Sequence, residues 1–149
     1  MKQIVKAESG HTLSEMVVVL MVITVTLGIP ILSYHSIHTK QVYRHFIELV
    51  SEDLRFAQQY AYANSKGVLI QVAGDHYYVK PEGIGEDPLI TRKIPANLSI
   101  ERSTVHLSEI FFNTRGNIRK PGTFYMITPA GRYRFVFLVG RGRFYVEET

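Results

Sequence analysis

SGHTLSEMVVVLMVITVTLGIPIL, residues Ser9 to Leu32, contains the longest apolar run of the chain. From Leu13 to Leu32 the only charged residue is Glu15. As a helix rising about 1.5 Å per residue, this run would be about 30 Å long, which matches the hydrocarbon core of a bilayer. A carboxylate inside such a run costs insertion free energy and needs a partner. We therefore expect residues 11–34 to form a transmembrane or assembly helix in which Glu15 has a specific role.

Length and composition limit what the remainder can be. The 149 residues are enough for one modest domain beside the apolar segment, and two large domains are excluded. The net charge of +4 indicates mild attraction to anionic partners without reaching a nucleic-acid signature. Cysteine is absent, which excludes disulfides, zinc–thiolate sites and thiol nucleophiles.

The amino terminus resembles a type IV prepilin signal. GHTLSE is followed by MVVVLMVITV, and the preceding residues are short and polar with two lysines. The resemblance implies that residues 1–10 are a leader, that a prepilin peptidase cuts between Gly10 and His11, and that His11 is then N-methylated. Glu15 becomes the fifth residue of the mature chain, where it pairs with the amino terminus of a neighbouring subunit. One departure is His11, because the family usually has phenylalanine at this place. The alternative is a single-pass anchor, or the tail of an ordinary membrane protein, with a stray glutamate.

An amphipathic helix is expected over residues 35–66 and a β-rich head over residues 67–149. The apolar residues recur at three- and four-residue spacings, and NSKG near Asn64 supplies a stop. VLIQV and HYYVK, joined by a turn at Ala73–Asp75, predict a β-hairpin. Further short strands are expected in LITRKI, LSIE, VHLSEIFF, TFYMIT, YRFVFLV and RFYVEE. The expected fold class is α+β, with a long N-terminal helix, membrane-spanning and then amphipathic, packed on a small antiparallel β-sheet head. The apolar stripe comprises Val42, Phe46, Ile47, Val50, Leu54, Ala57 and Ala61.

The carboxyl half carries a second resemblance. FFNTRGNIRKPGTFYM and YRFVFLVGRGRFYVEE are similar to the C-terminal pattern of GspH-type minor pseudopilins, and more closely to that of competence pseudopilins. The matching positions are Phe112, Asn113, Gly116, Gly122, Leu138, Gly140, Gly142, Arg143, Val146 and Glu147.

This resemblance implies a minor pseudopilin of a competence-type type IV pilus, needed for pilus assembly and for DNA uptake during transformation. The implied partners are other major and minor pilins, the prepilin peptidase and the cell membrane. The implied localisation is single-pass in the cell membrane with the head outside the cytoplasm, and at the cell surface after pilus assembly. The alternative within this architecture is a minor pseudopilin of a type II protein secretion system.

Enzyme chemistry is not indicated by the sequence. The six histidines form no HExxH or comparable cluster, and GRGRFY lacks the third glycine of a dinucleotide loop. We therefore expect no catalytic residue, metal or cofactor. The competing classes are a membrane-tethered adhesin and a hydrolase with an unrecognised site.

A basic region occupies the last third of the chain. No acidic residue occurs between Ile110 and Val146, and aromatic residues lie among the cations. Three interpretations are open: weak, non-specific contact with DNA phosphates, contact with acidic residues of another pilin, and a solvated sheet face. The cations are Arg115, Arg119, Lys120, Arg132, Arg134, Arg141 and Arg143.

Overall fold

The computed structural model describes residues 12–140 and 142–149, with the side chains of residues 28–39 left out. The chain divides into two compact units, Met1–His38 and Thr39–Thr149. We describe each unit by itself and call the second one the head.

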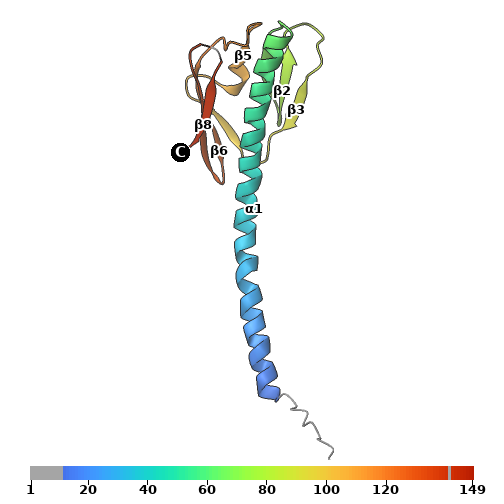
Figure 1. The fold of residues 1–149 in the computed structure, drawn as a ribbon, viewed down its shortest axis with the longest axis vertical. Coiled ribbons are helices and arrows are strands. Elements are labelled where there is room, and N and C mark those ends of the chain that lie inside the picture. The colour runs from blue at the N-terminus through green and yellow to red at the C-terminus, as the bar shows by residue number, and fades with distance from the viewer. Residues whose placement is uncertain (1–11, 141) are drawn as a thin grey trace, which may run out of the picture. The chain divides into compact units, whose positions relative to one another are not determined.

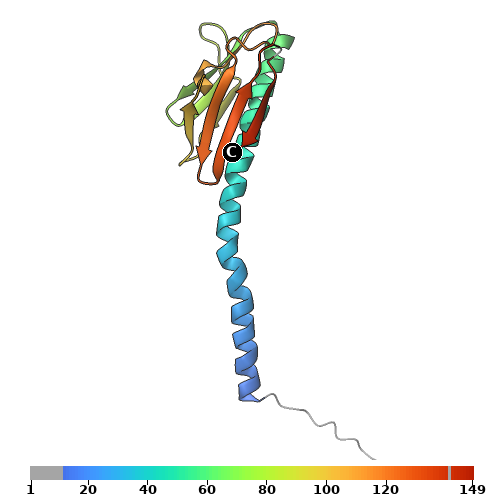
Figure 2. The same ribbon diagram turned by 90° about the vertical axis from the view of Figure 1, so that its left-hand side faces the viewer.

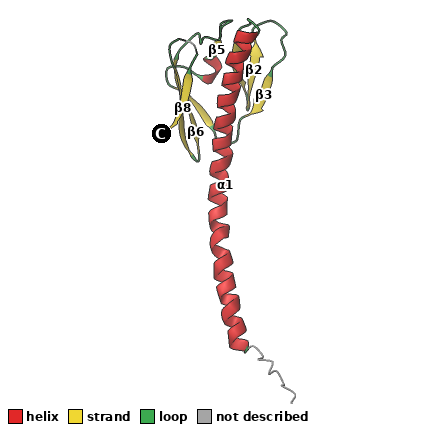
Figure 3. Cartoon of the chain, viewed as in Figure 1, coloured by secondary structure: helices red, strands yellow, loops and turns green. Residues whose placement is uncertain are grey.

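The helix α1 covers Leu13–Ala63, 51 residues, and therefore contributes to both units (Figures 1 and 3). Its first turn closes on the carbonyl of Thr12, which accepts from the backbone N–H of Glu15 at 3.0 Å. At the other end, Lys66 N–H donates to the carbonyl of Ala61 at 3.1 Å, and Ser65, with φ +49°, takes the left-handed conformation. This bond and conformation form a Schellman-type cap. The stop predicted near Asn64 is confirmed, and Ser65 rather than Gly67 is the left-handed residue.

The strands of the head form two antiparallel sheets of four strands each. Sheet A has the order β3-β2-β1-β5, and sheet B, which faces the viewer in Figure 2, has the order β4-β6-β7-β8. A short 3-10 helix, η1, precedes β5. The bounds are β1 Val68–Ala73, β2 His76–Pro81, β3 Ile90–Lys93, β4 Ser99–Arg102, η1 Leu107–Glu109, β5 Phe111–Phe112, β6 Gly122–Thr128, β7 Gly131–Phe137 and β8 Phe144–Glu148.

The β1–β2 hairpin confirms the sequence prediction. Ala73 lies opposite His76, so Gly74 and Asp75 form a two-residue loop, with Gly74 at φ +60°. The segment VHLSEIFF differs from expectation, because it forms η1 and then the two-residue strand β5. His106 caps η1 with its side chain, and Glu109 reaches back to the backbone N–H of His106. These polar contacts favour a turn over a continuous strand.

The core lies between the inner faces of the two sheets and the part of α1 that belongs to the head. All members of the predicted stripe except Val42 are buried, and Tyr43 is buried beside them. Phe124 and Phe135 stack in the centre with ring centroids 4.7 Å apart. Helix and sheets therefore share one apolar core, which holds the head together without disulfides.

Two parts of the expected fold class are wrong. The head is not built on one small sheet, because the chain leaves sheet A after β3 through the turn at Pro95–Leu98, and β4 pairs with β6 instead. Asn97 in this turn has φ +65°, which redirects the backbone.

The membrane-spanning helix is the second correction. Over the residues that the structure describes, no helix is both long and apolar enough to cross a bilayer. The single-pass localisation in the cell membrane, which depended on that span, is contradicted with it.

Candidate functional site

The first unit presents an apolar helical surface on all of its sides. Every side chain from Thr12 to Leu27 is exposed, and the exposed fractions of the large apolar ones run from 46% for Ile23 to 84% for Leu13. A surface helix of a globular protein has one apolar stripe, whereas a helix that is apolar all round is normally buried. We call residues Leu13–Leu27 the apolar segment of α1. Within the described unit, nothing covers it.

Glu15 is the one acidic residue of this segment. It lies in the first turn of α1, where the partial positive charge of the helix amino terminus favours a carboxylate. Its side chain is exposed, and no cation of the described residues forms an ion pair with it. The predicted cleavage and methylation positions, Gly10 and His11, lie outside the described residues.

A polar network ties the helix of the head to sheet A. The buried carboxylate of Asp53 accepts a hydrogen bond from the Tyr77 hydroxyl at 2.6 Å. It also accepts two from the Arg92 guanidinium, at 3.0 and 3.1 Å. Burial and the adjacent Asp53 carboxylate raise the pKa of Tyr77 well above its usual value of 10.0. This network was not predicted from the sequence, although Asp53 follows Val50 by three residues and so lies on the apolar stripe.

Two glycines of the carboxyl-terminal blocks meet beside α1. Gln58 Nε2 donates to the carbonyl of Gly116 at 2.9 Å. A Cβ added to Gly142 would lie 2.4 Å from Gln58 Nε2 and 2.6 Å from the Gly116 oxygen, and Gly142 has φ +66°. Gly116 and Gly142 both belong to the carboxyl-terminal resemblance, and the fold brings them together although they are far apart in the sequence. Only glycine fits at position 142.

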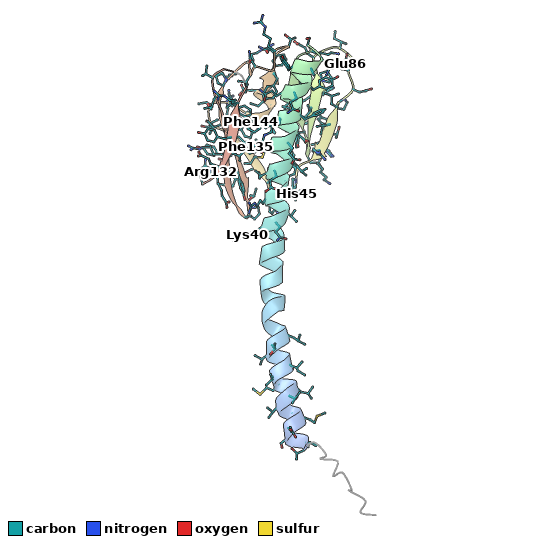
Figure 4. The ribbon with its side chains drawn as sticks, viewed as in Figure 1. Lys40, His45, Glu86, Arg132, Phe135 and Phe144 are labelled. Carbon is teal, nitrogen blue, oxygen red and sulfur yellow. The ribbon has the colours of Figure 1, made fainter. Side chains whose placement is uncertain are left out.

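The basic residues do not form one continuous patch. Of the six cations that the structure describes, three pair with carboxylates: Lys120 with Glu109 at 3.3 Å, Arg132 with Glu101 at 3.9 Å, and Arg134 with Glu147. Arg132 also stacks over the Tyr125 ring at 3.9 Å (Figure 4 labels Arg132). Glutamates that lie outside residues 110–146 therefore neutralise part of the positive charge of this region.

The remaining cations are dispersed. The Arg119 guanidinium lies over the Phe111 ring at 3.8 Å. Arg115 follows the turn at Asn113. The backbone N–H of Arg115 donates to the Asn113 side-chain oxygen at 2.9 Å. Arg143 is exposed in the loop before β8, and Arg141 lies outside the described residues. This arrangement favours contacts of one or two arginines with carboxylates over a broad phosphate-binding surface.

Among the described residues, no group of three His, Asp or Glu side chains is arranged to hold a metal ion. Comparison with known families, curated proteins and solved structures found no match to this chain.

Proposed function

We propose that this chain is a minor pseudopilin that works by assembly, joining a competence-type type IV pilus through the apolar segment of α1 and so serving DNA uptake during transformation. The observation that carries the proposal is the exposure of Leu13–Leu27 on every side of the helix. Burying such a helix requires neighbours all round it, as helices from several subunits of a filament would provide. Their contact would remove a large apolar area from water.

Glu15 gives the assembly a means of setting its register. A carboxylate buried among apolar helices is costly unless an opposite charge accompanies it. The amino terminus created by cleavage after Gly10 would supply that charge from a neighbouring copy, as the resemblance to prepilins implies. Subunits would then stagger so that each Glu15 meets one amino terminus.

The first test replaces Glu15. We expect Glu15→Ala to be processed normally and to fold normally, because the side chain is exposed and lies outside the head, yet to be depleted from sheared pilus fractions. Asp87→Ala is the matched control, since it removes an exposed loop carboxylate of the head. Incorporation of Glu15→Ala at the wild-type level would contradict the pairing role.

The second test addresses processing. Gly10→Phe should prevent removal of residues 1–10, because side-chain volume at the cut position obstructs the peptidase, whereas Ala7→Phe should be processed. Mass spectrometry of the amino terminus, in hosts with and without the prepilin peptidase, reads cleavage and methylation of His11 together. Loss of the leader from Gly10→Phe at the normal rate would place the cut elsewhere.

Deletion of the gene for this protein distinguishes a role in a competence pilus from a role in a type II secretion system. We expect transformation frequency to fall and protein secretion to be unchanged. A secretion defect with normal transformation would assign the subunit to a type II secretion system instead.

A further inference from the structure

Strand β8 is an edge strand of sheet B, and in the described part of the chain one of its backbone edges has no partner strand. The edge strands β3 and β4 carry charged residues, among them Arg92, Lys93 and Glu101. Charges of this kind normally protect a sheet edge against pairing with another chain. In β8 the two charged residues, Glu147 and Glu148, lie at the end of the strand, and the first three residues, Phe144, Tyr145 and Val146, carry no charge.

The backbone groups of β8 that point away from β7 follow from the register. Thr149 N–H donates to the Arg132 carbonyl at 2.8 Å, and Leu138 N–H donates to the Arg143 carbonyl at 2.9 Å. Because hydrogen-bonded positions alternate along an antiparallel pair, Tyr145 and Glu147 also face β7. The N–H and C=O groups of residues 144, 146 and 148 therefore point to the free edge. In the described part of the chain, no backbone group pairs with them.

A groove runs along this edge, between β8 and α1. Its volume is about 590 Å³, within the range of ligand sites. β8 lies beside the helix in both ribbon views (Figures 1 and 2). Ile47 and Ser51 of α1 line the groove on one side, and Phe144 and Val146 of β8 line it on the other.

The groove has unpaired acidic charge. Three carboxylates line it, those of Glu48, Glu52 and Glu148. Glu48 pairs with Arg44 at 3.3 Å, whereas no cation of the described residues forms an ion pair with Glu52 or Glu148. The remaining arginine of the groove, Arg55, lies 5.8 Å from the Phe144 ring centroid. An occupant with a basic side chain near Glu148 would complement this charge.

We propose that β8 accepts an extended segment of a partner protein as a fifth strand of sheet B, with apolar side chains facing Phe144 and Val146 and a basic side chain facing Glu148. Main-chain hydrogen bonds to the free edge supply the affinity of such β-strand addition, and side chains at alternate positions supply the specificity. This inference concerns the head alone and is independent of the assembly proposed for the apolar segment of α1.

Two blocked peptides, TVTVTKT and TKTVTVT, test the proposal with the full chain, one for each strand direction. We expect one of them to bind, and replacement of its lysine by glutamate to weaken binding about ten-fold. N-methylation at alternate residues is the decisive variant. Methyl groups on one set of alternate residues should weaken binding at least about ten-fold, because the N–H groups of that set face β8. Methyl groups on the other set should be tolerated.

Hydrogen exchange gives an independent readout on the protein. In the complex, the amides of residues 144, 146 and 148 should become protected, whereas those of Tyr145 and Glu147 already face β7 and should change little. Val146→Pro removes one free-edge donor without removing a bond to β7, and should weaken binding about ten-fold. Val146→Thr keeps the N–H and changes only the side chain, so it should weaken binding less than Val146→Pro does.

Three results would overturn the proposal: no binding of either peptide at about 1 mM, equal effects of N-methylation on the two sets of alternate residues, or protection at residues other than the alternate amides of β8. The peptide variants keep the test decisive even if Val146→Pro fails to fold.

Discussion

At the scale of single residues, the Asp53 carboxylate joins elements that are distant in the sequence. It lies on α1, Tyr77 lies on β2 and Arg92 lies on β3. A buried carboxylate needs hydrogen bonds from its surroundings, so removing one donor leaves a cost that the others cannot fully offset.

Tyr77→Phe should lower the free energy of unfolding of the head by about 1.5 to 3 kcal/mol, because one hydrogen bond to a buried charged group is lost. Tyr78→Phe is the control on the same strand, since Tyr78 is half-buried and points to the opposite face of sheet A. Urea denaturation of both variants measures the difference. Equal free energies of unfolding for the two variants would contradict a stabilising role for the Asp53 contact.

Gly142 is expected to tolerate substitution less well than Gly74, although both adopt a left-handed backbone, at φ +66° and +60°. Nothing lies within 4 Å of a Cβ at Gly74, so Gly74→Ala should cost only the conformational penalty of about 1 to 2 kcal/mol. Gly142→Ala adds a clash with the Gly116 oxygen and with Gln58, and should cost about 1 to 3 kcal/mol more. Thermal denaturation of the two variants tests this, and equal losses would argue against the close approach.

At the scale of an element, η1 depends on an ionised carboxylate. The backbone N–H of His106 donates to Glu109, and Lys120 and Arg102 lie within ion-pair distance. The His106 hydrogen bond, followed by these two cations, holds the pKa of Glu109 below its usual 4.5. A carboxyl group whose pKa is lower in the folded state stabilises that state above the unfolded pKa, and loses the contribution as pH falls through the folded value.

We therefore expect the stability of the head to be nearly constant from neutral pH down to about pH 5 and to fall below about pH 4.5. Glu109→Gln should be less stable at neutral pH and should show a shallower decline on acidification. Urea denaturation at several pH values measures both effects. An unchanged pH profile in the variant would remove Glu109 from the groups that control acid stability.

At the scale of the whole molecule, charge that is concentrated along the sequence becomes dispersed on the fold. Glu101, Glu109 and Glu147 lie outside residues 110–146 and pair with the cations of this region. Cross-strand neighbours account for part of this pairing, because Arg134 lies opposite Glu147 in the β7–β8 register.

Binding of DNA by the full chain should consequently be weak. If the three cations that pair with carboxylates do not contact phosphates, at most four of the seven basic residues can do so, and the slope of log affinity against log salt should be no steeper than about −3 to −4. A mobility-shift titration at several salt concentrations measures this slope, and Arg143→Glu should make it shallower by about 1 to 2. A slope near −6 would mean that all seven basic residues contact DNA together, against the dispersed arrangement.

Features that depend on neighbours along the chain could be predicted from the amino-acid sequence. The stripe from Phe46 to Ala61, the helix stop near Asn64 and the β1–β2 hairpin all followed from periodicity and turn chemistry. Tertiary structure alone decided the division of the strands into two sheets, the burial of Asp53 with Tyr77 and Arg92, and the neutralisation of the basic residues. These features depend on which strands pair and which side chains face each other across the core. Local propensity does not specify such long-range contacts, because they are selected by the packing of the whole domain.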